Sequence, residues 1–549
     1  MAAEAAAPPA AELRRRVAAL LVVRASGHLA DGQRRYPRWE LDNASLRRLL
    51  AEGVGGVILL GGSAAELNLR IRQLRSWAAR PLLLCADVEE GVGQRFDGAS
   101  WLVPPLALGR LHQSDPAVAL ALAQRYGRCT GREARALGLN WVLAPVCDVN
   151  NNPANPVINV RAWGEDPTTA AALACAFVEG AQAEGVLTCA KHFPGHGDTS
   201  DDSHLALPCL PHDRQRLDAV ELPPFRAAIA AGVATVMTAH LLLPALDRER
   251  PATLSAAVLD GLLRQELGFG GLIVTDALVM EAIAQRHGPG EAAVLALAAG
   301  ADLVLMPADA DAALEAIVAA VTQGRLAWGR LEASLERRNR ALAAVAAGLE
   351  ATAPANLAQA PLGALSNGPA ADDAQLALEL VDRSLMTSRG RLQRVGEGLN
   401  LLRFDNLCAS PALPLTAPAL ELPAALGYRA LLLDSRSPSP WSGDPDAPLM
   451  LERLGPGPVL VQLFVRGNPF RGSAGAGEPW AAVLAQLLAA DRLAGLAVYG
   501  SPYLWDNLRT LLPDRVAAGW CPGQMPLAQQ RLLAALGAGP GPGEGGFTD

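Results

Sequence analysis

Residues 186–204 read VLTCAKHFPGHGDTSDDSH, and this stretch indicates what kind of fold the chain adopts. The apolar run from Val186 to Ala190 ends directly in Lys191 and His192, and a loop rich in proline, glycine and acidic residues follows. In parallel α/β enzymes, buried strands deliver polar side chains at their carboxyl ends, where the active site forms. The pattern therefore predicts a buried parallel strand and, after it, a loop that carries functional residues.

Lys191 is the only lysine of the chain, because the other 46 of its 47 basic residues are arginine. Lysine presents a compact point charge and arginine a planar fork of donors, so the two are not interchangeable at a tight site. The alternative is a lysine that survives by chance on a solvated surface, but the apolar strand directly before it argues against that position. We therefore expect Lys191 to have a specific role.

Seven further apolar runs have the same form, each followed by turn residues and a segment with helical periodicity. Pro116–Leu137 and Thr168–Glu184 are examples of such helical segments. Eight β/α units in about 300 residues are typical of a (β/α)8 barrel of the TIM type. An open doubly wound sheet is the alternative, but residues 24–28 lack the glycine fingerprint that it predicts. The seven runs are Val17–Val23, Gly55–Leu60, Leu82–Val88, Trp141–Val149, Ala234–His240, Leu272–Leu278 and Leu303–Pro307.

The predicted fold class is thus α/β, with a catalytic barrel over residues 1–349 and a smaller α/β sandwich domain over residues 373–536. Residues 350–372, rich in alanine, proline and asparagine, are predicted to be a linker. The glycine-rich residues 537–549 are predicted to form a disordered tail. Strands of the second domain are expected at Ala430–Asp434, Val459–Phe464 and Gly495–Tyr499, with a helix over Trp480–Ala490.

Composition limits the classes of partner. The formal net charge of −8 and the lack of a long basic run argue against nucleic acid and against anionic membranes. No apolar run approaches the roughly 18 residues of a membrane span, and the first residues do not read as a secretory signal. The eight cysteines are scattered, which suggests reduced thiols in a cytoplasmic protein. Nothing in the sequence indicates an oligomeric state, and we expect neither a metal nor another cofactor.

Polar residues recur at the same end of the predicted strands. The third run ends in Asp87, the fourth in Asp148, the fifth in Lys191 and His192, the sixth in His240, and the seventh contains Asp276. Asp276 suits a nucleophilic carboxylate at the barrel mouth, and capping of the next helix is its structural alternative. Nearby Arg95 and Arg161 add donors, so this end of the barrel suits a polyhydroxylated ligand.

The loop after Lys191 offers two kinds of chemistry. Asp202 and His204 can form a dyad in which the carboxylate orients the imidazole and raises its basicity, which gives a general acid/base near neutral pH. His192, His196 and Asp198 are metal ligands by type, so a metal-dependent hydrolase is an alternative. Their spacing fits no standard zinc pattern, and a hydrogen-bonded structural role is the better interpretation of His196.

These segments together resemble glycoside hydrolase family 3, and its β-N-acetylhexosaminidase branch most closely. The resemblance covers nearly all of residues 10–345. It rests on KHFPGHGDT and DSH within 191–204, APVCDVNNNPANPVINVRAWGEDP at 144–167, LGFGGLIVTDALVM at 267–280 and AGADLVLMP at 299–307. The third-strand motif departs from the family pattern, because Glu90 stands in place of a glycine and Val92 in place of a basic residue. The C-terminal region resembles the family's second domain more weakly.

The resemblance implies a barrel enzyme that cleaves terminal β-linked N-acetylglucosamine with retention. It implies Asp276 as nucleophile, with His204 as acid/base and Asp202 as its partner. It further implies that five residues bind the sugar: Asp87, Arg95, Arg161, Lys191 and His192. By family analogy the substrate comes from cell-wall recycling. A β-glucosidase or a glycoside phosphorylase of the same family, and a catalytically inactive sugar-binding protein, are the remaining alternatives.

Overall fold

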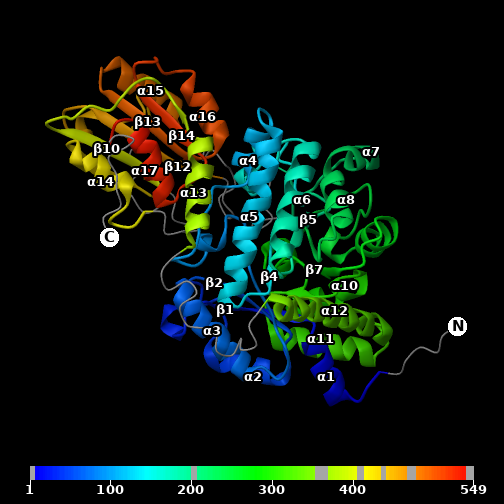
Figure 1. Cartoon of the computed structure of the whole chain (residues 1–549). Coiled ribbons are helices and arrows are strands. Elements are labelled where there is room, and N and C mark those ends of the chain that lie inside the picture. Colours follow the sequence, from blue (N-terminus) through cyan, green and yellow to red (C-terminus); the bar gives the residue numbers. More distant parts are fainter. Residues whose placement is uncertain are drawn as a thin grey trace. The chain divides into compact units, whose positions relative to one another are not determined.

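The computed structural model describes residues 7–199, 207–352, 369–404, 413–434, 441–466 and 478–539. Contacts divide the chain into two compact units (Figure 1). The first consists of Met1–Trp101, Leu108–Asn152 and Ala162–Ala374, and the second of Leu102–Ala107, Pro153–Arg161 and Gln375–Asp549. Residues 353–368 of the predicted linker and 540–549 of the predicted tail lie outside the described residues.

The first unit is a closed barrel of parallel strands. Hydrogen bonds order the strands as β4-β3-β2-β1-β8 in one arc and β5-β6-β7 in the other. Two parallel bridges, Trp141↔Leu187 and Val274↔Leu303, join the arcs, so the predicted (β/α)8 barrel is confirmed. The strands are β1 (Leu21–Ser26), β2 (Gly56–Leu60), β3 (Leu83–Ala86), β4 (Trp141–Val142), β5 (Cys189–Phe193), β6 (Thr235–Thr238), β7 (Leu272–Val274) and β8 (Val304–Leu305).

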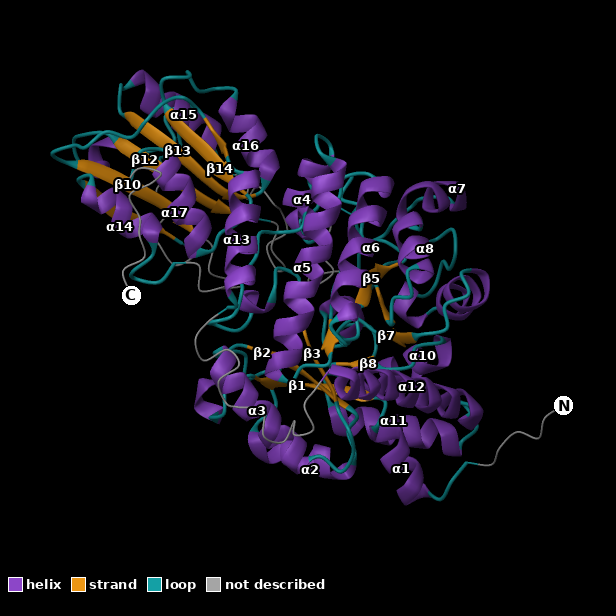
Figure 2. Ribbon diagram, in the orientation of Figure 1, coloured by secondary structure: helices purple, strands orange, loops and turns teal. Residues whose placement is uncertain are grey.

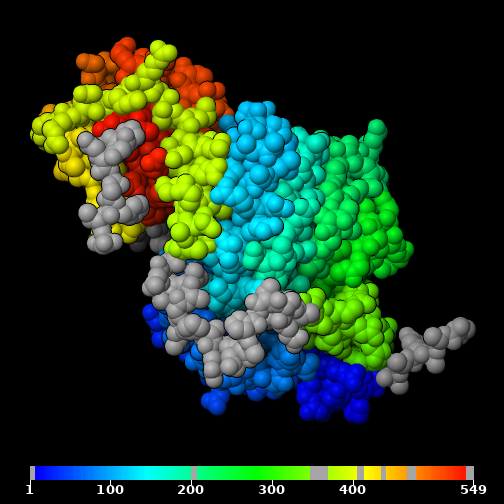
Figure 3. Space-filling view, in the orientation of Figure 1, coloured from blue at the N-terminus to red at the C-terminus, as the bar shows by residue number. Residues whose placement is uncertain are grey.

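Helices surround the strands (Figure 2), and on the face that Figure 3 shows they form the outer surface of this unit. None of the described helices is both long and apolar enough to cross a membrane. The helices are α1 (Ala10–Ala18), α2 (Asn43–Glu52), α3 (Ala64–Trp77), α4 (Leu106–His112), α5 (Pro116–Leu137), α6 (Pro167–Ala183), α7 (Arg214–Arg216), η4 (Leu217–Glu221), α8 (Pro223–Ala230), η6 (Ala257–Glu266), α9 (Glu281–Ala284), α10 (Pro289–Ala299), α11 (Ala310–Thr322) and α12 (Trp328–Thr352).

Helix α5 shows how the sequence sets these elements. Asp115 caps its start by accepting from Val118 N at 3.2 Å, and Gly138 ends it in the left-handed conformation. Its partner α6 approaches closely through glycines, since a Cβ on Gly127 would lie 2.3 Å from Phe177 O. The predicted helix Pro116–Leu137 is therefore confirmed to the residue.

The eight barrel strands are all shorter than the predicted runs, and two of the differences have a clear cause in the sequence. The run Val17–Val23 becomes strand only from Leu21, because α1 continues to Ala18 and places Leu13 and Val17 on one buried face. The run Trp141–Val149 forms a ladder only at Trp141–Val142. Pro145 explains the early end, since proline has no N–H to donate to a neighbouring strand.

The second unit contains a mixed sheet in the order β11-β10-β12-β13-β14-β9, where only β9 is antiparallel. The three predicted strands and the helix α15 are confirmed, but β9, β10 and β14 were not predicted. The strands are β9 (Met386–Thr387), β10 (Gly398–Phe404), β11 (Tyr428–Leu433), β12 (Val459–Val465), β13 (Leu493–Gly500) and β14 (Ala517–Cys521). The helices are α13 (Ala371–Ser384), α14 (Pro418–Ala425), α15 (Trp480–Ala489), α16 (Pro502–Arg509) and α17 (Pro526–Ala535).

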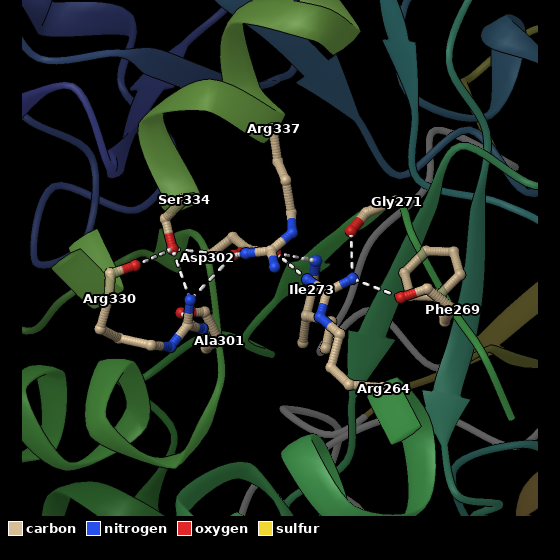
Figure 4. Close-up of polar contacts among 9 residues, drawn as sticks. All are labelled: Arg264, Phe269, Gly271, Ile273, Ala301, Asp302, Arg330, Ser334 and Arg337. Atoms are coloured by element: carbon tan, nitrogen blue, oxygen red, sulfur yellow. Dashed lines mark hydrogen bonds and ion pairs between the residues drawn. The ribbon is translucent and has the colours of Figure 1, made fainter. Parts of the chain in front are cut away.

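The buried carboxylate of Asp302 connects several elements at the amino ends of β7 and β8 (Figure 4). Asp302 is 0% exposed and accepts from Ile273 N at 2.9 Å and from Ser334 Oγ at 2.8 Å. Three guanidinium groups, from Arg264, Arg330 and Arg337, surround the same carboxylate. In barrels of this type, the amino ends of the strands serve stability and not catalysis.

We therefore expect Asp302→Ala to lower the free energy of unfolding by about 3–5 kcal/mol, because it leaves three partly buried cations without their shared partner. Chemical denaturation followed by circular dichroism measures this change. The control is Arg325→Ala, which removes only the exposed ion pair with Glu291 and is expected to cost about 1 kcal/mol or less. Equal effects of the two substitutions would contradict the role of Asp302.

Candidate active site

The lone lysine is buried at the mouth of the barrel, by which we mean the carboxyl ends of its strands. Lys191, on β5, is 1% exposed, so its surface alternative is wrong. Its Nζ lies 2.7 Å from Asp87 Oδ1 and 2.6 Å from Glu89 Oε1, just beyond β3. One ammonium thus holds two carboxylates together. Sequence reasoning assigned no role to Glu89, although it lies two residues after Asp87, where an extended chain returns to the same side.

Asp148 is a second residue whose role the sequence did not reveal. It is fully buried, and its Oδ2 lies 2.8 Å from His192 Nδ1. Its Oδ1 accepts from two backbone N–H groups, those of His192 at 3.1 Å and His196 at 2.7 Å. Burial raises the pKa of Asp148, but the neighbouring imidazoles outweigh burial, so its pKa lies below the ordinary value. Asp148 therefore fixes the orientation of the His192 ring.

His196 is a structural residue, as predicted. Its Nδ1 lies 2.8 Å from Thr199 Oγ1, and the side chain is buried. Burial lowers its pKa to about 4, so His196 is neutral at physiological pH. The carboxylate of Asp198 forms ion pairs with His212 Nε2 at 2.9 Å and with Arg216 Nη2 at 3.1 Å.

Asp276 directly follows β7 and Thr275, and its side chain is partly exposed. Its Oδ1 accepts from Ala277 N at 2.7 Å, while the next helix, α9, starts only at Glu281 and has Met280 in the capping position. The helix-capping alternative is therefore wrong. The charge of Asp276 acts on His196, whose pKa it raises against the larger effect of burial. Asp276 thus lies in electrostatic range of the cluster formed by His192, His196 and Asp148.

The remaining predicted site residues have different outcomes. Arg95 is near Asp87, since its Nε donates to Asp87 O at 2.9 Å. Asp202 and His204 lie outside the described residues. Arg161 belongs to the second unit, where its Nη1 donates to Val157 O at 3.1 Å. The structure therefore brings together Asp87, Arg95, Lys191 and His192, with Asp276 in electrostatic range of that group.

Glu90, which stands where the family pattern has a glycine, is held by local hydrogen bonds. Glu90 is 1% exposed, its Oε2 accepts from Trp101 Nε1 at 3.0 Å, and its N–H donates to Gln94 Oε1 at 3.1 Å. These bonds hold the segment between Asp87 and Arg95. Carboxylates, one ammonium and an oriented imidazole at one barrel mouth can bind hydroxyl groups and place a carboxylate against a reacting carbon. Fold and site together define the class of carbohydrate-active barrel proteins.

The chain belongs to glycosyl hydrolase family 3. Residues 12–341 match the Glycosyl hydrolase family 3 N terminal domain, and residues 391–537 match the Bacterial Glycosyl hydrolase family 3 C-terminal domain.

Three relatives illustrate the similarity. A beta-N-acetylglucosaminidase/beta-glucosidase of Cellulomonas fimi is 35% identical over 52% of this chain and 51% of its own length. A beta-hexosaminidase of Stenotrophomonas maltophilia is 38% identical over 48% of this chain and 80% of its own length. The solved family 3 beta-N-acetylglucosaminidase of Paenibacillus sp. FPU-7 is 31% identical, with a TM-score of 0.74 over 95% of this chain and 96% of that one. The alignment thus spans about half the length of the Cellulomonas relative.

Proposed function

We propose that the protein is a retaining β-N-acetylglucosaminidase that hydrolyses terminal β-linked N-acetylhexosamine residues. The observation that carries the proposal is the position of Asp276, which follows a buried barrel strand and caps no helix. It also lies in electrostatic range of the cluster built on Asp148. The names of the relatives supply the sugar, since they include both beta-hexosaminidase and beta-N-acetylglucosaminidase.

The described residues have distinct tasks in this proposal. Asp87 is held by Lys191, and its carboxylate, with a side chain 35% exposed, can accept from a sugar hydroxyl. Lys191 keeps the two carboxylates at one position, and Arg95 fixes the backbone that presents Asp87. His192 keeps Nε2 available for the substrate because Nδ1 faces Asp148. In the proposed complex, the sugar held by these residues presents its anomeric carbon to Asp276.

Two displacements complete the reaction. The Asp276 carboxylate attacks the anomeric carbon while the bond to the leaving oxygen breaks, and the His204 imidazolium protonates that oxygen. Neutral His204 then takes a proton from water, the water oxygen attacks the same carbon, and Asp276 leaves as a carboxylate. Asp202 orients His204 in both steps. The roles of His204 and Asp202, and that of Arg161 as a donor to the sugar, rest on the family resemblance alone.

The test compares an aryl β-N-acetylglucosaminide with the matching aryl β-glucoside. Cleavage of the acetamido sugar alone supports the proposal. A preference for the glucoside would favour a β-glucosidase, a second candidate that the name of the Cellulomonas relative suggests. Cleavage of neither substrate would favour a sugar-binding protein, and a sugar 1-phosphate formed in phosphate buffer would indicate a phosphorylase.

His204→Ala should slow substrates with poor leaving groups by about 10²–10⁴-fold, because general acid catalysis contributes about that factor. Aryl glycosides with acidic phenols should be affected far less, since these leaving groups need little protonation. The measurement is kcat/KM for a series of aryl N-acetylglucosaminides plotted against the pKa of the phenol. A slope as shallow as that of the wild-type enzyme would contradict the role of His204.

The natural substrate we propose is a cell-wall fragment recycled in the cytoplasm. The seven cysteines in the described part of the chain are free thiols, which suits a reducing compartment. Supplying such fragments to the purified protein and identifying released N-acetylglucosamine by mass spectrometry tests this proposal.

A further inference from the structure

Three side chains of the kinds that bind metal ions meet beside the loop that follows β5. Asp198 lies in that loop, His212 lies just before α7, and Glu221 is the last residue of η4. Each offers one nitrogen or oxygen atom, and these atoms all lie within 4.8 Å of one another. Residues from three separate segments thus converge at one point. We name Asp198, His212 and Glu221 the carboxylate–histidine cluster.

Close packing holds Glu221 against the loop. Gly195 in the loop has no side chain, and a Cβ on it would lie 2.7 Å from Glu221 Cβ. Glu221 ends a π-helix, a rare form of helix that is frequent at functional sites. Although it is charged, Glu221 is only 3% exposed, so its carboxylate forms the inner side of the cluster.

Arg216 contacts only one oxygen of each carboxylate. Its Nη2 lies 3.1 Å from Asp198 Oδ2 and 3.2 Å from Glu221 Oε1. The second oxygen, Glu221 Oε2, is buried and has no hydrogen-bond partner among the described residues. Because buried polar atoms are nearly always satisfied in folded proteins, this oxygen indicates a ligand that is not part of the chain.

The charges and the accessibility of the cluster suit a cation. Asp198 and Glu221 carry two negative charges and Arg216 one positive charge, so the group is anionic when His212 is neutral. His212 Nε2 lies 2.9 Å from Asp198 Oδ2, and their side chains are 22% and 23% exposed. An ion from solution can therefore reach these two side chains, with Glu221 Oε2 behind them.

We propose that Asp198, His212 and Glu221 bind a zinc ion. Zn²⁺ takes imidazole nitrogen and carboxylate oxygen as ligands at about 2.0–2.2 Å, and three protein ligands with one water complete a tetrahedral site. Mg²⁺ and Ca²⁺ prefer oxygen ligands alone, so the imidazole favours zinc. The ion connects the loop after β5 with η4 and takes no part in bond cleavage. This site shares no residue with the proposed sugar site, so it does not rest on the proposed function.

A second group of possible metal ligands is satisfied by other contacts. Cys129, Glu133 and Asp373 also lie within 4.8 Å of one another, but all three are buried. Glu133 accepts from Ser100 Oγ at 2.7 Å, and Asp373 forms an ion pair with Arg132. No oxygen of this group is a buried atom without a partner in the described part of the chain. The second group therefore serves as a comparison in the test.

The experiment titrates Zn²⁺ into the full chain by isothermal titration calorimetry, after a chelator has removed bound metal. Wild type should bind one equivalent that His212→Gln and Glu221→Gln both weaken. Their Kd should rise by at least about 100-fold, since losing a ligand should exceed the 10–100-fold cost of losing an outer partner of a ligand. Saturating Zn²⁺ should also raise Tm of wild type and not of the variants, because an ion that binds only the folded state stabilises it.

Two variants are matched controls. His287→Gln removes an imidazole that follows α9 and belongs to neither group, and Cys129→Ser removes a ligand of the second group. Both should keep the Kd of wild type. Circular dichroism of the metal-free variants checks that each one folds. If His212→Gln does not fold, Glu221→Gln decides the result.

The possible outcomes separate the metal site from the proposed function. The site is wrong if wild type binds no Zn²⁺, or if the folded variants of the cluster keep the wild-type Kd. Loss of binding in Cys129→Ser would place the ion in the second group, and loss in His192→Gln alone would place it beside Asp148, so either result overturns the proposal. A protein that cleaves an aryl N-acetylglucosaminide and binds no Zn²⁺ would overturn the metal site and leave the proposed function standing.

Discussion

Asp276→Ala should lower kcat for aryl N-acetylglucosaminides by about 10⁴-fold or more, with the fold intact, because the covalent intermediate can no longer form. The fold should tolerate loss of this carboxylate, since Asp276 is partly exposed and its side chain accepts from the adjacent Ala277 N. Circular dichroism should remain unchanged. The control is Asp260→Ala, which removes an exposed carboxylate of η6 that accepts from Gln265 Nε2 and should leave kcat unchanged.

Added azide shows which catalytic group the Asp276→Ala variant lacks. In Asp276→Ala the side of the sugar that faces the nucleophile is open, so azide should restore turnover of an activated aryl substrate and give the α-glycosyl azide. If azide instead gave the β-azide, the missing group would be the acid/base, and Asp276 would have the wrong role. Full activity without azide would exclude Asp276 as the nucleophile.

Lys191→Arg is expected to reduce kcat/KM by about 10²–10³-fold although the charge is retained, since arginine is not a conservative replacement at a tight site. Nζ is a single atom that contacts carboxylates at 2.7 and 2.6 Å, and the side chain is 1% exposed. The larger planar guanidinium cannot occupy that position without moving Asp87. Steady-state kinetics measure the loss, and near-normal activity would contradict the role of Lys191.

Lys191→Met provides the matched comparison. Methionine has a similar length without the charge, so Asp87 and Glu89 would repel each other, and stability should fall by about 3–5 kcal/mol. Lys191→Arg should lose much less stability than Lys191→Met. If both variants lost activity only in proportion to unfolded protein, Lys191 would be a structural residue with no effect on the sugar site.

The barrel was predictable because its strands are short apolar runs that end in polar residues. The predicted strand bounds were wrong at two places for different reasons. Val17 belongs to the helix α1, and Pro145 cannot donate a hydrogen bond that would continue β4. In the second unit, β10 was missed because it buries Asn400. Gln462 Nε2 donates to Asn400 Oδ1 at 2.8 Å, so that polar group is satisfied inside the sheet. Such pairing between strands leaves no signal in a single sequence.

The candidate site was predictable in part for the same reason. Residue type and strand ends pointed to Asp87, Lys191, His192 and Asp276. Asp148 was also noted at a strand end, but its contact with His192 was not predicted, and neither was that of Glu89 with Lys191, because both are contacts between different strands.

The buried lone lysine also gives the protein an unusual chemical property. Lys191 carries the only side-chain primary amine of the sequence, and that amine is enclosed by two carboxylates. Acylating reagents that label lysine should therefore leave the side chains of the folded barrel unmodified and react at one position once the mouth opens. The extent of labelling at a single peptide, followed over time by mass spectrometry, then reports the opening of the sugar site directly. Bound ligand should slow that labelling.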